Sequence, residues 1–164
     1  MHMIYFLFFL IFSCSKKNAI AWNACSDVVQ DHPCDFTLLD QHGKDWNLYE
    51  NYGKVIIVDF STEWCSWCRV AAAEINSVES VYDVIYVTVM LQDMMGRPAD
   101  DHLVKRWAQT FNLTSPVLIG STELIPWNVE ALPTFYVINK EMVIVGIIEG
   151  YNPQMLEAYI KEAQ

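Results

Sequence analysis

A continuous run of six residues, Val55–Phe60, most constrains what this chain can fold into, because its apolar side chains do not alternate with polar ones. A strand with one face in water would alternate, so the run is typical of a central strand buried on both faces. Beyond Cys65 the apolar spacing changes to i, i+4, i+7 and i+11, which marks one face of a helix. We therefore expect the chain to pass from a buried strand into a helix at Cys65.

The segments that follow extend this pattern. Val84–Met90 predicts a second buried strand, so the strand, helix and strand should form a parallel, right-handed crossover. Pro98 suits the first turn of a second helix. Thr134–Asn139 and Met142–Glu149 are separated by two residues, which predicts an antiparallel hairpin, and a final helix is expected to begin at Asn152.

Upstream, Phe36–Leu39 and Lys44–Leu48 predict a short additional hairpin. The order β-α-β-α-β-β-α indicates an α/β fold with a mixed sheet and helices on both faces. The length of 164 residues suits one domain with a short appendage. The 20 acidic and 10 basic residues give a formal net charge of −10, which argues against nucleic acid as a main partner.

The chemistry is expected at Cys65 and Cys68, two thiols three residues apart at a strand-to-helix junction. The helix N-terminus there would stabilise a Cys65 thiolate, with Arg69 adding positive field, while Cys68 lies one turn inside. Such a thiolate attacks a partner disulfide, and the second thiol resolves the mixed disulfide. Cys65 and Cys68 could instead be half of a zinc site, but the sequence has no second such cysteine pair or suitably spaced histidine pair to complete it. A purely structural disulfide is the other alternative.

The chain has five cysteines. If Cys14 is lipidated, four cysteines remain, and the sequence alone allows three ways to pair them. Pairing Cys65 with Cys68, the two nearest in sequence, leaves Cys25 and Cys34 as a second pair. A structural disulfide, a resolving pair that exchanges electrons with the main site, and two unpaired thiols are the alternatives for Cys25 and Cys34. The four histidines are scattered, so no metal site is predicted, and no cofactor is required.

The N-terminus begins with an apolar run of ten residues, Met3–Phe12, which as a helix reaches only about 15 Å and cannot span a bilayer. We interpret residues 1–13 as a signal peptide, because the Ile-Phe-Ser-Cys sequence ending at Cys14 resembles a bacterial lipobox. Residues 14–33 would then be the lipidated Cys14 and a tether, and residues 34–164 the folded domain. Cleavage after Ala21 is the alternative.

The motifs together resemble thioredoxin-fold proteins, in particular the membrane-tethered TlpA/ResA-like thiol-disulfide oxidoreductases. The resemblance is carried by Asp35-Phe36-Thr37-Leu38, Gly53-Lys54-Val55, Val58-Asp59-Phe60, Trp64-Cys65-Ser66-Trp67-Cys68-Arg69 and Leu132-Pro133-Thr134-Phe135. It implies a three-layer α/β/α sandwich with a central mixed β-sheet.

The resemblance also implies roles for individual residues. Cys65 would be the nucleophile, Cys68 the resolving thiol, and Pro133 would follow a cis peptide that faces both cysteines. The Leu132 backbone beside such a bond could pair with an extended partner segment. Asp59 matches the buried acid of thioredoxins, whose raised pKa lets it exchange the proton of Cys68.

Three positions depart from the family pattern. The dipeptide between the cysteines is Ser66-Trp67, where relatives usually carry Pro second. Ala73 stands at the position of a helix-kinking Pro, and Ala71 replaces a frequent Glu. These departures leave the direction of electron flow open from the sequence.

The expected function is that of an enzyme on the extracytoplasmic side of a bacterial cell envelope, a lipid-anchored thiol-disulfide oxidoreductase that keeps partner cysteines reduced. The resemblance suggests apocytochrome c or other metal-site cysteines as clients and a membrane thiol carrier as electron donor. A peroxiredoxin-like peroxidase is an alternative, because Thr62 and Cys65 form a T-x-x-C, although Val58 replaces that family's Pro. A non-catalytic binding module is the third.

Overall fold

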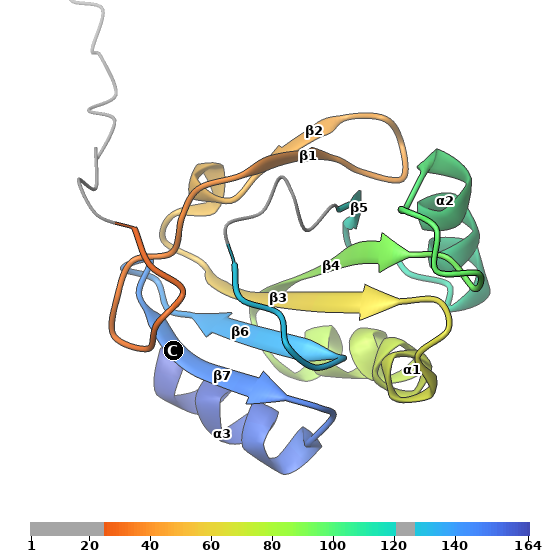
Figure 1. Ribbon diagram of the computed structural model, residues 1–164. Helices are drawn as coiled ribbons and strands as arrows, with labels where there is room; N and C mark the ends of the chain where they lie inside the picture. The colour runs from red at the N-terminus through yellow and green to blue at the C-terminus, as the bar shows by residue number, and fades with distance from the viewer. Residues whose placement is uncertain (1–24, 121–126) are drawn as a thin grey trace, which may run out of the picture.

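The computed structural model describes residues 25–120 and 127–164 (Figure 1). In chain order its elements are β1 (Thr37–Leu39), β2 (Asp45–Asn47), the 3₁₀ turn η1 (Tyr49–Asn51), β3 (Val55–Thr62), α1 (Ser66–Val81), β4 (Val84–Gln92), α2 (Asp101–Thr110), β5 (Val117–Ile119), β6 (Thr134–Ile138), β7 (Ile144–Glu149) and α3 (Pro153–Ala163). Residues 1–13, which we interpret as a signal peptide, and Cys14 lie outside the described residues.

The main sheet has five strands in the order β5-β4-β3-β6-β7. β3 is its central strand, parallel to β4 and antiparallel to β6, and all eight of its residues are buried. This confirms the expected mixed sheet and explains the continuous apolar run, because neither face of β3 meets water. β1 and β2 form a separate two-stranded hairpin.

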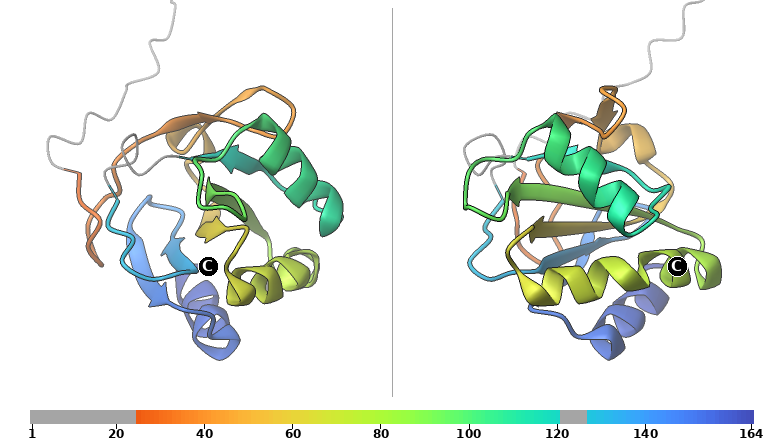
Figure 2. Two further views of the ribbon diagram at one scale, coloured as in Figure 1. Left: turned by 45° about the vertical axis from the view of Figure 1, so that its right-hand side comes forward. Right: turned by 90° about the vertical axis from the view of Figure 1, so that its right-hand side faces the viewer.

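The sheet lies between layers, as expected for an α/β sandwich. Buried residues of α1, α2 and α3 all belong to one core, so the three helices lie on the same side of the strands, with α2 toward the β4–β5 edge (Figure 2). The β1–β2 hairpin covers the other side, where a helix was expected from the sequence. Alternate side chains of β3 enter two different cores, Val55 and Ile57 beside α1 and α3, and Ile56 and Val58 beneath the β1–β2 hairpin. The central strand therefore joins both halves of the interior.

Two local features differ from the sequence-based expectation. β5 was not predicted, because three residues are too few to show a period, and it is recognised only by its parallel pairing with β4. The second helix does not begin at Pro98. It begins at Asp101, because the Asp100 side chain accepts a hydrogen bond from Leu103 N at 2.8 Å and caps it, while Pro98 forms a bridge with Gln92.

The segment before the domain packs against it. A disulfide joins Cys25 to Cys34, and Gln30 and Asp31 exchange backbone hydrogen bonds with Ile144 at the start of β7. Residues 25–33, expected as the last part of a tether, are thus attached to the domain. Within residues 25–120 and 127–164, no helix is both long enough and apolar enough to cross a bilayer.

Candidate active site

The two cysteines of the Cys-x-x-Cys motif are bonded at the start of α1. Cys65 is the N-cap residue of this helix, and its Sγ accepts a hydrogen bond from Cys68 N at 3.1 Å. A disulfide joins the two residues, whose Cα atoms are 5.2 Å apart. Cys65 is 7% exposed and Cys68 is fully buried, so the first sulfur is the one nearer to the surface.

The surroundings of Cys65 favour a thiolate once the bond is reduced. The unpaired N–H groups of a helix N-terminus stabilise negative charge, and α1 carries no acidic residue in its first turn to oppose this. Arg69 follows Cys68 and lies over the rings of Trp107 and Phe111, at 6.0 and 5.7 Å from their centroids. Its positive charge therefore stays close to the helix start.

Asp59 is a fully buried acid on β3, and its side chain lies on the sheet face covered by α1. Its Oδ1 accepts a hydrogen bond from Ser61 Oγ at 2.7 Å, and its Oδ2 accepts one from Tyr86 Oη at 3.3 Å. Burial raises the pKa of Asp59 to about 7, and the two hydroxyl donors act in the opposite direction. The carboxyl group therefore changes charge near neutral pH.

Pro133 is preceded by a cis peptide bond from Leu132. β6 begins at the next residue, Thr134, which pairs with Phe60 near the end of β3. Because β3 leads into the cysteine motif, Pro133 and the cysteines share one end of the sheet. Leu132 is half-buried, and among the described residues its backbone makes no hydrogen bond.

The loop that carries Cys65 is held by contacts that the sequence did not indicate. Glu63 accepts hydrogen bonds from Nε and Nη2 of Arg106, at 2.9 and 3.0 Å, and from Met94 N at 2.9 Å. These donors lower the pKa of Glu63. Trp64 Nε1 also donates to Gln92 Oε1 at 3.0 Å. Glu63 is therefore a structural acid that fixes the loop against β4 and α2.

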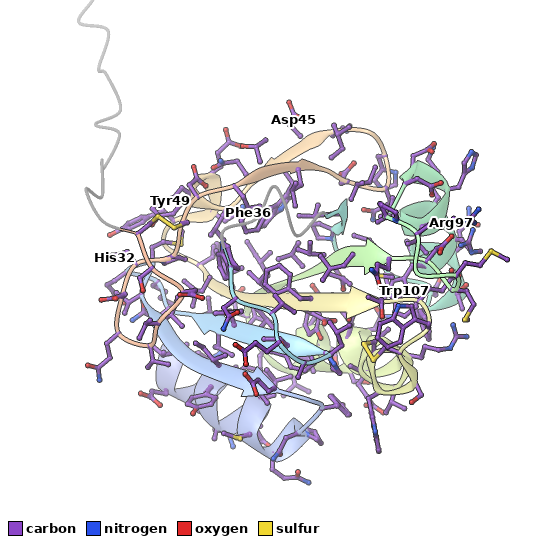
Figure 3. The ribbon with its side chains drawn as sticks, viewed as in Figure 1. His32, Phe36, Asp45, Tyr49, Arg97 and Trp107 are labelled. Carbon is purple, nitrogen blue, oxygen red and sulfur yellow. A yellow bond between two sulfur atoms is a disulfide. The ribbon has the colours of Figure 1, made fainter. Side chains whose placement is uncertain are left out.

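The second cysteine pair lies at the opposite end of the sheet. Asp31 pairs with Ile144, which is opposite Ile138, and Ile138 is in turn opposite Ile56 at the beginning of β3. The eight residues of β3 separate that end from the Cys65 end by about 23 Å. In Figure 3, His32 and Tyr49 mark the end of the Cys25–Cys34 bond, and Arg97 and Trp107 mark the end of the Cys65–Cys68 bond. Direct exchange between the two pairs within one molecule is therefore ruled out by distance.

Across residues 25–120 and 127–164, no three His, Cys, Asp or Glu side chains are grouped so as to hold a metal ion. The cysteine pair itself supports sulfur exchange, because a nucleophile lies near the surface, a second thiol lies behind it and a buried acid lies on β3, the strand that leads into the motif.

Comparison with known proteins agrees with this site. The family model of the thioredoxin-like domain matches residues 43–164. The thiol-disulfide oxidoreductase ResA of Geobacillus thermodenitrificans is 28% identical over 118 residues, which cover 71% of this chain and 66% of that protein.

Solved structures show the same fold. The thiol:disulfide interchange protein DsbE of Chlorobium tepidum superimposes with a TM-score of 0.72 at 23% identity, over 84% of this chain and 99% of that one. The exposed lipoprotein thioredoxin Etrx1 of Streptococcus pneumoniae gives a TM-score of 0.63 at 25% identity, over 79% and 99%. With the family model spanning most of the domain and Cys65 and Cys68 bonded at its strand-to-helix junction, the chain belongs to the thioredoxin-like domain family and is a thiol-disulfide oxidoreductase similar to ResA.

Proposed function

We propose that this protein is a lipid-anchored, extracytoplasmic reductase of protein disulfides, with Cys65 as nucleophile and Cys68 as resolving thiol. The observation that carries the proposal is the position of the two sulfurs. Cys65 caps α1 near the surface and Cys68 is buried one turn behind it. A partner disulfide can therefore reach only Cys65, while Cys68 is already within bonding range of the Cys65 sulfur.

The reaction starts from the reduced pair. The Cys65 thiolate attacks one sulfur of the partner disulfide, a mixed disulfide forms, and the partner's other sulfur leaves as a thiolate. Cys68 then loses its proton and attacks the Cys65 sulfur. The Cys65–Cys68 disulfide forms, the second partner sulfur leaves, and two electrons have passed to the partner. A membrane thiol carrier would return two electrons to the pair.

Asp59 is the proposed acceptor of the Cys68 proton. Both groups are buried on the α1 side of β3, where water is scarce and a thiol needs an internal base. With a pKa raised to about 7, Asp59 takes and returns a proton near neutral pH, which an ordinary surface aspartate does not.

The Leu132 backbone is the proposed docking edge for the client. Its N–H and C=O, which make no hydrogen bond with the described residues, lie at the sheet end that carries Cys65, where an extended segment could add to them as a further strand. Such a segment would bring its own cysteine toward Cys65. Exported polypeptides whose cysteines must be reduced before they bind a metal or haem, such as apocytochrome c, are the proposed clients.

Anchoring through Cys14 is supported by the lipobox-like sequence and by the similarity to an exposed lipoprotein. The ten residues between Cys14 and the Cys25–Cys34 bond could extend by no more than about 35 Å. Because that bond lies at the end of the sheet opposite Cys65, the anchored domain would present its redox site away from the membrane. Client proteins would then reach Cys65 from the side of the domain that faces away from the membrane.

The decisive experiment traps the client. In Cys68→Ser the mixed disulfide cannot be resolved, so affinity-tagged protein expressed in its native membranes should retain covalent adducts that release on reduction and can be identified by mass spectrometry. Cys65→Ser is the matched control and should retain none. Equal yields from the two variants would contradict the proposed roles, and peroxide consumption by the wild type without disulfide reduction would favour the peroxidase instead.

A further inference from the structure

The two oxygens of the buried Asp59 carboxylate are held by two different hydroxyl groups. Ser61 is two residues further along β3 and lies on the same face, so its Oγ reaches Oδ1 at 2.7 Å. Tyr86 comes from the parallel neighbour β4 and its Oη reaches Oδ2 at 3.3 Å. Asp59 and Ser61 are fully buried and Tyr86 is 2% exposed. Solvent therefore cannot substitute for either donor.

Both hydroxyls act as donors throughout the neutral pH range. Burial and the neighbouring Asp59 raise the pKa of Tyr86 well above its ordinary value, so its hydroxyl stays protonated. A serine hydroxyl does not ionise. Donation to a carboxylate stabilises the charged form, which burial alone would disfavour. The pair thus offsets part of the cost of charging Asp59.

The other groups that face this pocket do not supply a counter-charge. Tyr151, after β7, interacts with both Asp59 and Tyr86, and its own pKa is raised. The negative charges of Glu74 and Glu79 on α1 raise the pKa of Tyr151 and the pKa of Tyr86, respectively. β6 contributes the apolar Phe135 opposite Asp59, and α1 contributes the two cysteines. Ser61 and Tyr86 are the groups that lower the pKa of Asp59.

We propose that Ser61 and Tyr86 are positioning residues of the redox site, which orient the Asp59 carboxylate through separate oxygens and keep it available as the base for Cys68. The inference rests on the proposed function, in which Asp59 receives the Cys68 proton. Each oxygen retains a lone pair beyond its hydroxyl contact, so a proton can still be accepted. Loss of either hydroxyl leaves Cys68 and Asp59 in place but makes the carboxylate harder to ionise.

The test separates the two sulfur steps with a small aromatic disulfide, 5,5′-dithiobis(2-nitrobenzoate). Reduced protein releases one coloured thiolate when Cys65 attacks and a second when Cys68 resolves the mixed disulfide. Single-turnover absorbance from pH 5.5 to 8.5 gives the midpoint of the second phase, which we expect near pH 7 in the parent. In Ser61→Ala and Tyr86→Phe this midpoint should rise by about one pH unit. The second phase at pH 7 should then slow by about fivefold and approach the parent rate at alkaline pH.

Ser61→Ala should cause the larger shift, because its hydrogen bond is the shorter one. Tyr136→Phe is the matched control. Tyr136 is 1% exposed and its hydroxyl donates to Asn128 O at 2.7 Å, so the variant removes a buried tyrosine hydroxyl without touching Asp59. Its midpoint should equal that of the parent.

A double-mutant cycle tests whether Tyr86 acts through Asp59. In an Asp59→Asn background, Tyr86→Phe should no longer change the pH profile of the second phase, because the titrating group is gone. An unchanged midpoint in both Ser61→Ala and Tyr86→Phe would overturn the inference while leaving the proposed function intact. Absence of a second phase in the parent would instead overturn the proposed function itself.

Discussion

The two disulfides of this domain join cysteines of the same chain but occupy unlike places. Cys65–Cys68 lies where β3, the strand that carries the buried Asp59, ends and α1 begins. The Leu132 backbone at the same sheet end makes no hydrogen bond within residues 25–120 and 127–164. Cys25–Cys34 lies at the opposite end of the sheet, where the N-terminal segment is fastened to the domain. A bond between two sulfurs therefore becomes a redox site through the groups that surround it.

The contacts around the Cys25–Cys34 bond are structural and hold the N-terminal segment against the domain. Trp127 Nε1 donates to Cys34 O at 3.3 Å, and Asn128 N donates to Asp27 Oδ2 at 2.9 Å. Cys34 is nearly buried, and the segment also pairs with β7. Among the described residues, neither an α-helix N-terminus nor a buried acid adjoins this pair, in contrast to the Cys65–Cys68 pair.

The largest expected effect is on catalysis. Cys65→Ser should lower the rate of disulfide reduction by at least about a hundredfold, because the remaining thiol of the motif, Cys68, is fully buried and cannot be reached by a partner disulfide. The rate is measured by dithiol-dependent reduction of insulin. The double variant Cys25→Ala plus Cys34→Ala should stay within about twofold of the parent. A comparable loss in the double variant would remove the distinction between the two pairs.

The next effect is a dependence of stability on pH. The pKa of Asp59 is raised to about 7, so the folded state holds a proton that the unfolded chain has already released between about pH 4 and pH 7. The stability contributed by the protonated form is complete below about pH 4 and is lost as the pH rises through 7. Asp59→Asn should therefore stabilise the domain by about 2–4 kcal/mol at pH 8 and by little at pH 4.

Denaturant unfolding at the two pH values measures this difference. Ser61→Ala serves as the comparison, since it should increase rather than remove the pH dependence. Equal stabilisation by Asp59→Asn at pH 4 and pH 8 would contradict the raised pKa.

Removal of the second disulfide should affect stability instead of activity. Cys25 and Cys34 are 9 residues apart in sequence. Closing a loop of this size contributes about 2–3 kcal/mol in the chain-entropy model. Cys25→Ala plus Cys34→Ala should lower the free energy of unfolding by this amount, measured by denaturant titration with the active-site pair oxidised. No change in that free energy would mean that the segment is held by its hydrogen bonds alone.

The smallest expected effect concerns the loop that carries Cys65. Glu63 is largely covered, but its partner Arg106 is half-exposed, so solvent weakens the pair. Arg106→Gln should lower the stability at pH 7 by less than about 1 kcal/mol. Because the pKa of Glu63 is lowered, the contribution is present at neutral pH and is lost on acidification. Thermal unfolding at pH 7 and pH 3 checks this, and an equal deficit at both would exclude the ion pair as its cause.

Much of the architecture was readable from local sequence patterns. The Val55–Phe60 run predicted the central strand, the change of period after Cys65 predicted α1, and the asparagine at position 152 predicted the start of α3. Such features depend on neighbours along the chain, so they leave a periodic trace. β5 left none because it is three residues long, and Pro98 was misleading because Asp100 is the residue that caps α2.

The candidate site was only partly readable. The cysteine pair and Asp59 were identified from motifs, and Ser61 could have been added because residues two apart in a strand share a face. The contact from Tyr86 could not, since it depends on the register in which β4 lies beside β3. The same holds for the Arg106 contact with Glu63, whose partners are 43 positions apart.

The sequence by itself determined the elements, the sulfur pair and its place at a strand-to-helix junction, because hydrophobic periodicity and helix ends act over a few residues. Tertiary structure alone decided which hydroxyls reach the buried carboxylate, what holds the Cys65 loop, and that the two disulfides lie at opposite ends of the sheet. Those outcomes depend on strand register and on packing between distant segments, and a register shift of one residue would turn each side chain to the other face.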